Sequence, residues 1–308
     1  MSPDGLFDPS QYRGELASSA SSPTDLTEAL ALDRETTFVP GDDGLLARKV
    51  ALHSLDKAHY ARYYADIVGR SMQHAYGGPL AWVELFSGPG RLYVKDLKTF
   101  KTGSPIEALT IREPFDYYVF ADLDPRCTDV LRQRVARTAP ELPNVHVLDG
   151  DANAAELHDR IISIVPKNAL VVLYGDPAGL DLNFDTLRFF AERYKHLDLL
   201  LNVPVPGVVR ALRAGHQGKA AKMLNHPSPI ELIGPTSGRP GLSLRDWFQR
   251  QLGGLGYKYF ASEVVKLHIK NVALYDVMLA SREERAKQFF NEAVKRGPGG
   301  QYAMDVGC

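Results

Sequence analysis

The stretch WVELFSGPGR, residues 82–91, decides the fold of this chain. It is a short apolar run that carries one carboxylate, Glu84, and then breaks into a turn of Ser, Gly, Pro and Gly. A carboxylate near the end of a buried strand costs free energy unless a donor or a cation bonds to it. The stretch therefore predicts a strand that leads into a loop, and it raises the question of what that loop holds.

Similar apolar runs recur four times after this loop, and helical patterns separate the later ones. The runs are DYYVFAD (116–122), NVHVLDG (144–150), NALVVLYGD (168–176) and LDLLLNVPV (197–205), and the helical patterns are PRCTDVLRQRVART (125–138), NAAELHDRIISIV (153–165) and FDTLRFFAERY (184–194). Near-continuous apolar strands that alternate with helices are typical of a parallel sheet covered on both faces. The predicted fold class is therefore α/β, with a Rossmann-like, mostly parallel, doubly wound sheet.

The last third of the chain has a different pattern. Two apolar runs, YKYFASEVVKLHI (257–269) and VALYDVMLASR (272–282), are joined by Lys270 and Asn271. They predict an antiparallel hairpin at the C-terminal end of the domain. A final helical pattern, EERAKQFFNEAVKR (283–296), follows the hairpin.

Composition and pattern also divide the chain into segments. Residues 1–44, rich in Ser, Asp, Gly and Pro, predict a loosely ordered arm. Residues 45–78 predict an N-terminal helical extension that stops at Gly77-Gly78-Pro79. Residues 79–296 are the predicted main domain, with a helical insertion over 199–256 on its substrate side, and residues 297–308 are a tail.

The bulk composition excludes several classes of protein. The 308 residues carry a formal net charge of -1, so any surface that binds anions must be local. Two cysteines, Cys127 and Cys308, cannot form a disulfide framework or a four-ligand zinc site, and we expect no metal. The N-terminus lacks the pattern of a signal peptide, and no apolar run reaches the roughly 20 residues that span a bilayer. We therefore expect a cytoplasmic protein without a membrane partner.

Acidic residues follow four successive predicted strands. They are Glu84, Asp122, Asp151 and Asp176, and the first strand also leads into Gly88 and Gly90. In a doubly wound sheet the carboxyl ends of the strands form one edge, where ligands bind. A ligand with an amine, two ribose hydroxyls and an exocyclic amino group would give these carboxylates donors, and S-adenosylmethionine has all three. Asp122 is then placed to bind the ribose and Asp151 to bind the adenine edge.

Other interpretations of the same residues are weaker. A single Gly-x-Gly turn is as often structural as functional, and any one strand-end Asp is as often a helix cap as a ligand. A phosphate-binding P-loop is disfavoured because no Gly-Lys-Ser or Gly-Lys-Thr follows. A dinucleotide-binding oxidoreductase is disfavoured because Tyr93 stands where its third glycine belongs. Four acids in order at the expected intervals favour cofactor binding.

Several motifs together resemble the class I methyltransferases and, more closely, the three-Cys-motif partner (TcmP) family. They are FSGPG (86–90), GSPIEAL (103–109), VFADLDP (119–125), GDAN (150–153), DPAG (176–179), VPVPGVVR (203–210) and ALYDVMLASR (273–282), which spread over roughly residues 46–295. The loop after the fourth strand departs from the family, since Gly175 stands where an apolar residue is expected before the Asp. The family's name refers to a second protein with three cysteines, and this chain has no such cluster.

The resemblance implies which residues hold the methyl donor. Glu84 and the backbone of the first loop would bind its methionine end, and Ser104 at the start of a helix would offer N–H groups to its carboxylate. A plain helix N-cap is the alternative for Ser104. The full set of implied cofactor residues is Glu84, Phe86, Ser87, Gly88, Gly90, Ser104, Asp122, Leu123, Asp151 and Ala152.

Asp176 is the candidate catalytic residue. Methyltransferases that act on the nitrogen of a base carry an Asp or Asn followed by Pro-Pro and an aromatic residue at this strand end. Here Asp176 and Pro177 are followed by Ala178 and Gly179, so no aromatic residue is present to stack a flipped base. Asp176 is interpreted as orienting an acceptor nitrogen or oxygen for in-line methyl transfer, with a structural turn as the equal alternative.

Basic residues flank the predicted cleft. Arg91 and Lys95 follow the first loop, and Arg210 and Arg213 follow the fifth strand. They slightly favour a nucleic acid acceptor, RNA or DNA, over a peptide or a small molecule. The alternative function is a non-catalytic, S-adenosylmethionine-binding partner that assembles with a second protein.

Overall fold

A central sheet organises the part of the chain that the computed structural model describes, which is residues 37–234, 240–267 and 272–296. Its strand order is β10-β11-β9-β8-β3-β6-β7. The strands are β3 (Leu80–Leu85), β6 (Tyr117–Asp122), β7 (Val145–Asp149), β8 (Leu170–Gly175), β9 (His196–Val203), β10 (Tyr259–Leu267) and β11 (Val272–Ser281). β3, β6, β7, β8 and β9 pair in parallel, whereas β11 pairs antiparallel with β9 and with β10. The predicted fold class, a mostly parallel sheet with a C-terminal antiparallel hairpin, is confirmed.

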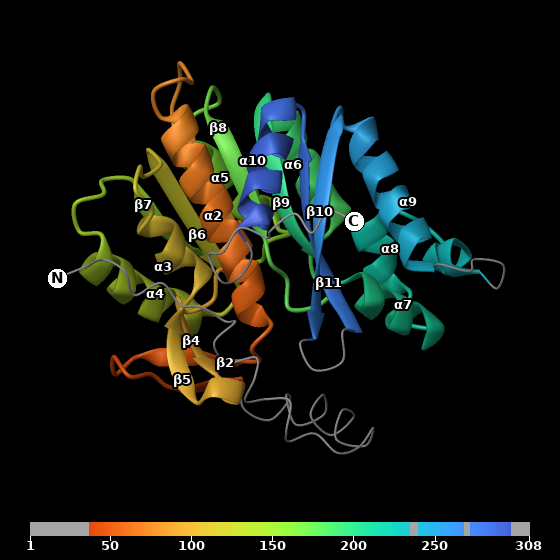
Figure 1. The fold of residues 1–308 in the computed structure, drawn as a ribbon, viewed down its shortest axis with the longest axis horizontal. Helices are drawn as coiled ribbons and strands as arrows, with labels where there is room; N and C mark the ends of the chain where they lie inside the picture. Colours follow the sequence, from red (N-terminus) through yellow and green to blue (C-terminus); the bar gives the residue numbers. More distant parts are fainter. Residues whose placement is uncertain (1–36, 235–239, 268–271, 297–308) are drawn as a thin grey trace, which may run out of the picture.

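Helices cover both faces of this sheet (Figure 1). One face packs against α2 (Ser54–Met72), α3 (Ser104–Leu109), α4 (Pro125–Thr138) and α10 (Glu284–Lys295). The other face packs against α5 (Ala155–Ile164), α6 (Phe184–Arg193), α7 (Val205–Arg213), α8 (Gly218–Leu224) and α9 (Pro240–Gly254), with a 3₁₀ turn at Pro229–Ile233. Burial on both sides explains why every residue of β3 is buried. None of the helices described here is long and apolar enough to span a bilayer.

The strand order changes direction beside β3. The chain runs from β3 outward through β6 to β7, and it then returns to the other side of β3 with β8 and β9. The loops after β3 and β8 therefore leave the sheet side by side and in opposite directions. A sheet of this kind opens a crevice at that point, at the carboxyl ends of the strands. This topology determines where the site lies.

A second, four-stranded sheet in the described residues lies at that edge and differs from the sequence prediction. It has the order β1-β2-β4-β5, with β1 (Phe38–Pro40), β2 (Leu46–Val50), β4 (Arg91–Val94) and β5 (Thr99–Thr102), and a 3₁₀ turn at Lys95–Leu97 joins the last two. We call it the accessory sheet; it lies below α3 in Figure 1. Residues 45–53 were predicted to be helical, and this was wrong, because β2 finds partners in β1 and β4 and α2 begins only at Ser54. The accessory sheet contains strands from both sides of residue 44 and from both sides of residue 78, where segment boundaries were predicted. Most of the predicted arm, residues 1–36, lies outside the described residues.

A buried arginine ties the accessory sheet to the first loop. Arg134 of α4 is 5% exposed, and its guanidinium donates to both carboxylate oxygens of Asp43 at 2.7 and 2.8 Å. The same group donates to the carbonyls of Leu46, at 2.8 Å, and Pro89, at 2.5 Å. The hydrogen bond from Arg134 is the largest effect on the pKa of Asp43 and lowers it to about 2, against the opposing effect of burial. One side chain therefore fixes the accessory sheet over the glycine loop.

Gly90 is the position in this loop where a side chain is least tolerated. Its φ is +77°, and a Cβ there would lie 2.8 Å from Cδ1 of Leu131 and 3.1 Å from Cγ1 of Ile106. We expect Gly90→Ala to lower the free energy of unfolding by about 2–4 kcal/mol, because it adds a clash to left-handed strain. Gly44→Ala is the matched control, because Gly44 has a φ of +78° and no atom within 4 Å of a Cβ. Its expected loss is roughly 1 kcal/mol, and equal losses in chemical denaturation would contradict the packing argument.

Candidate functional site

A cavity of about 410 Å³ opens at the carboxyl edge, between the first loop and the accessory sheet. One wall comes from the glycine loop at 86–90, from Gly103 and Ser104, and from Asp176 after β8. The opposite wall comes from β2 and from the first turns of α2, including Arg48 and Lys57. The cavity thus brings together three segments that the sequence predicted at the site and two that it did not, β2 and the start of α2.

The glycine loop is held by bonds to the end of β6. The N–H groups of Ser87 and Gly88 donate to the Ala121 carbonyl, at 2.9 Å, and to Oδ2 of Asp122, at 2.7 Å. Pro89 has no N–H, and the loop takes left-handed backbone angles at Phe86, with φ of 66°, and at Gly88, with φ of 63°. A phosphate nest needs free N–H groups in succession, and here two of them are already bonded. The loop therefore suits close backbone approach to a ligand.

Glu84 lies immediately behind this cavity and is fully buried. Its carboxylate accepts from Oγ of Ser104, at 2.5 Å, and from Nε1 of Trp82, at 3.1 Å. Among the described residues, no Lys or Arg side chain bonds to it. Burial raises the pKa of Glu84 to about 8, the two donors oppose that rise, and the charges of Asp176 and Asp122 add to it.

Ser104 serves this carboxylate and does not cap its own helix. The N-cap residue of α3 is Gly103, and the Ser104 hydroxyl makes no capping bond. The N-cap alternative for Ser104 is therefore wrong. The bond to Glu84 links the end of β3 to the start of α3 across 20 positions of sequence, so the strand before the glycine loop and a helix after it share one polar contact.

The residues predicted to bind ribose and adenine lie beside the cavity, after β6 and β7. Oδ2 of Asp122 holds Gly88, and Oδ1 accepts from the Asp124 N–H at 2.9 Å. Leu123 is 68% exposed. Oδ1 of Asp151 accepts from the N–H of Asn153 at 2.9 Å, and Ala152 is buried. These side chains do not line the 410 Å³ cavity, and their predicted roles stay predictions.

Asp176 sits in a network that sequence reasoning did not foresee. Its Oδ1 accepts from Nζ of Lys57, at 2.7 Å, and from Nδ2 of Asn202, at 2.8 Å. Asn202 also donates to the Tyr174 hydroxyl at 3.2 Å. Lys57 lies 119 positions before Asp176 in the chain, on α2, so no local pattern could have paired them. The network holds the carboxylate in one orientation at the mouth of the cavity.

The four basic residues predicted on the substrate side do not line this cavity. The Arg91 guanidinium is bonded to both carboxylate oxygens of Asp42. Lys95 lies in the 3₁₀ turn of the accessory sheet, and Arg210 and Arg213 are exposed on α7. Among the described residues, Arg48, Lys49 and Lys57 are the Lys and Arg side chains that line the site instead. The run LARKV (46–50) does not alternate apolar and polar residues, so no periodic pattern in the sequence pointed to Arg48.

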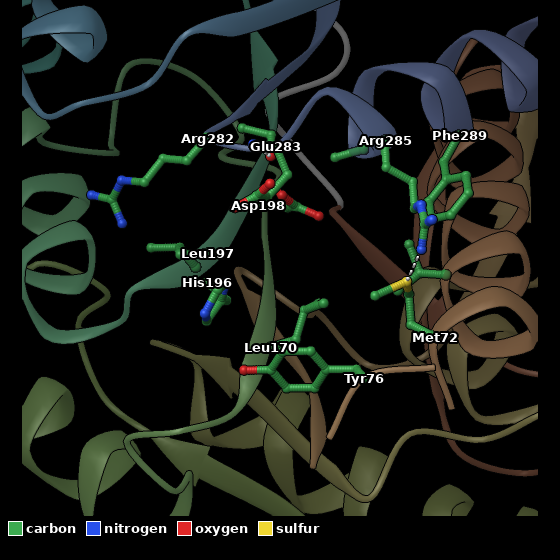
Figure 2. A pocket seen from close by; sticks show the side chains of 13 residues that line it. Met72, Tyr76, Leu170, His196, Leu197, Asp198, Arg282, Glu283, Arg285 and Phe289 are labelled. Carbon is green, nitrogen blue, oxygen red and sulfur yellow. Dashed lines mark hydrogen bonds between the residues drawn. The ribbon is translucent and has the colours of Figure 1, made fainter. Parts of the chain in front are cut away.

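A second cavity of about 290 Å³ lies at the opposite edge of the sheet (Figure 2). Its walls come from the end of α2, the starts of β8 and β9, and α10, with Met72, Tyr76 and Phe289 among the apolar side chains. Asp198 accepts from the Tyr64 hydroxyl there at 2.8 Å, and burial raises its pKa to about 6. None of the strand-end residues reaches this cavity, so it is separate from the predicted site.

Comparison with known proteins adds distant likenesses in fold. No protein-family model matches the sequence, and no curated protein matches it. An O-methyltransferase from Bacillus cereus, solved in complex with SAH, is 12% identical, with a TM-score of 0.43 over 88% of this chain and 96% of the other. The cofactor-bound Rv0187 from MTB is 11% identical, with a TM-score of 0.44 over 90% and 98%. TYW2 from M. jannaschii, solved with AdoMet, is 11% identical, with a TM-score of 0.40 over 80% and 86%. Likenesses this distant assign no activity, and the TcmP family remains a resemblance.

Proposed function

We propose that this protein is an S-adenosylmethionine-dependent methyltransferase that transfers a methyl group to a nitrogen or an oxygen. Glu84 is the observation that carries the proposal. A fully buried carboxylate without a cationic partner among the described residues is costly, and burial raises its pKa to about 8, which favours its neutral form at pH 7. The ammonium group of S-adenosylmethionine would supply the missing cation.

The other residues of the site fit the same ligand. The glycine loop offers close approach, and the side chains of Asp122, Leu123 and Asp151 flank the next two strand ends. Leu123 gives the edge an exposed apolar surface that suits the face of an adenine ring. When bound, the cofactor supplies an activated methyl group on its sulfonium sulfur.

The chain's own contribution to the reaction is positioning. Lys57 and Asn202 bond to one oxygen of Asp176, so the acid is held still beside the cavity. An acceptor that donates a hydrogen bond to this carboxylate would be oriented for in-line displacement. Fixing the angle of attack removes a part of the entropic cost of such transfers.

Isothermal titration calorimetry with S-adenosylmethionine and with S-adenosylhomocysteine tests the cofactor directly. We expect one site per chain for each ligand. An absence of binding at millimolar concentrations of both ligands would overturn the proposal.

Replacing Asp151 with alanine tests the adenine side of the site. We expect a loss of S-adenosylhomocysteine affinity of about tenfold, since a hydrogen bond to a charged group contributes roughly 1.5 kcal/mol. Asp159→Ala is the matched control, because Asp159 is exposed on α5. Equal affinities of the two variants in calorimetry would show that Asp151 does not contact the cofactor.

A further inference from the structure

Arg48 is a cation at the cavity that has no hydrogen-bond acceptor among the described residues. It lies on β2 and lines the cavity, and its Nη1 is 3.8 Å from the point where a Cβ on Gly88 would stand. Within the described residues, no side-chain or backbone oxygen accepts a hydrogen bond from its guanidinium. An arginine that points into a partly enclosed space with its donors free is ready for a planar oxyanion.

The described side chains that line the cavity carry more positive than negative charges. Arg48, Lys49 and Lys57 line it, whereas Asp176 is the one carboxylate among its lining residues. Lys57 and Asp176 neutralise each other in a 2.7 Å ion pair, whereas within the described residues neither Arg48 nor Lys49 forms an ion pair. The charge of Arg48 contributes to the lowered pKa of Asp124, but that lowering is due first to a hydrogen bond from Arg126.

We infer that the acceptor is a small molecule with a carboxylate or phosphate group, and that Arg48 binds this oxyanion beside the glycine loop. The inference rests on the proposed methyl transfer and names its acceptor class. The accessory sheet gains a role from it, because β2 carries Arg48 and Arg134 fixes β2 over the loop. The oxyanion bound by Arg48 and the atom oriented by Asp176 would hold the acceptor at two points.

The surroundings favour a small acceptor over a nucleic acid. A polyanion is bound by a track of unpaired cations along its phosphates. Here several cations around the edge are already neutralised by acids, in the pairs Arg91–Asp42, Arg126–Asp124, Arg132–Asp149 and Lys219–Asp181. The slight preference for a nucleic acid acceptor rested in part on Arg91 as a residue that could bind phosphate. In the structure the guanidinium of Arg91 is bonded to both carboxylate oxygens of Asp42, so it no longer supports that preference.

Oxyanion binding to the cofactor-loaded protein tests the inference. The full chain is saturated with S-adenosylhomocysteine and titrated with benzoate and, separately, with inorganic phosphate. We expect one of the two probes to bind at a single site and Arg48→Gln to weaken it at least tenfold. The probe that binds shows whether the group is a carboxylate or a phosphate. Arg137→Gln, a change at an exposed arginine of α4, is expected to leave the affinity unchanged.

The outcomes separate this inference from the proposed function. Failure of S-adenosylhomocysteine itself to bind would overturn the proposed function. Normal cofactor binding with no saturable binding of either probe would overturn the oxyanion site alone. A tenfold loss of cofactor affinity in Arg48→Gln would instead assign Arg48 to the cofactor's own carboxylate and overturn the inference. Displacement of the probe by a short single-stranded RNA, with a steep salt dependence, would reject the small acceptor.

Discussion

Replacing Glu84 with glutamine is expected to weaken S-adenosylhomocysteine binding by about 100-fold. Glutamine keeps the size of the side chain and can still bond to Ser104, but it cannot pair with the ligand's ammonium. Loss of a buried charge pair costs about 3 kcal/mol, which corresponds to that factor. Calorimetry at pH 8 measures it, and Glu156→Gln, an exposed change on α5, is the control.

The pH dependence of binding should identify Glu84 specifically. Burial raises the pKa of Glu84 to about 8, so at pH 7 the ligand-free protein holds a proton there that the ammonium must displace. We expect affinity to rise from pH 6 to pH 8, and nearly one proton to be released per ligand at pH 7. Calorimetry in buffers of different ionisation enthalpy counts that proton. Proton release that persists unchanged in Glu84→Gln would show that another group is responsible.

The same substitution should stabilise the ligand-free protein at alkaline pH. The folded-state pKa of Glu84 is raised from 4.5 to about 8, so its contribution to stability is full below pH 4.5 and is lost as pH rises through 8. Glutamine has no such loss. Relative to the wild type, the variant should gain unfolding free energy on the order of 2–4 kcal/mol between pH 5 and pH 8.5. Asp198 also titrates in this range, but it is common to both proteins and cancels in the difference.

Asp176→Ala should abolish methyl transfer and keep cofactor affinity within about threefold. The carboxylate orients the acceptor, and loss of orientation lowers the rate by roughly 100-fold or more. Asp181→Ala is the matched control, because Asp181 lies in the same loop and pairs with Lys219 away from the cavity. Turnover is followed as label transferred from methyl-labelled S-adenosylmethionine to the small-molecule, RNA or protein fraction of a cell extract.

The result for Asp176 decides between catalysis and a purely binding role. If Asp176→Ala transfers as much label as the wild type does, Asp176 has no role in the reaction. Cofactor binding without label transfer to any fraction would favour the alternative of a non-catalytic partner protein. Lys57→Met should reproduce a part of the Asp176→Ala defect in kcat, since Lys57 acts through the carboxylate that it holds.

Much of the central sheet was predictable because its signals are local. Each parallel strand is a short apolar run, and burial on both faces requires that pattern regardless of which strand lies beside it. The convergence of Glu84, Asp122, Asp151 and Asp176 followed from one topological rule, that the carboxyl ends of these strands share an edge. The accessory sheet lacked such local signals: residues 45–53 were predicted to be helical, but β2 is stabilised by β4, more than 40 positions away.

The sequence by itself determined the doubly wound sheet, its C-terminal hairpin and the edge at which a ligand would bind. Those features depend on periodicity and on glycine and acid placement, which each segment carries alone. Only the tertiary structure decided that Lys57 holds Asp176, that Asp42 occupies Arg91, and that Arg48 faces the glycine loop. Charges act through space over a few ångströms, so a cation's availability depends on which acids the fold places beside it. The sequence contains those acids but does not show which of them lie in contact.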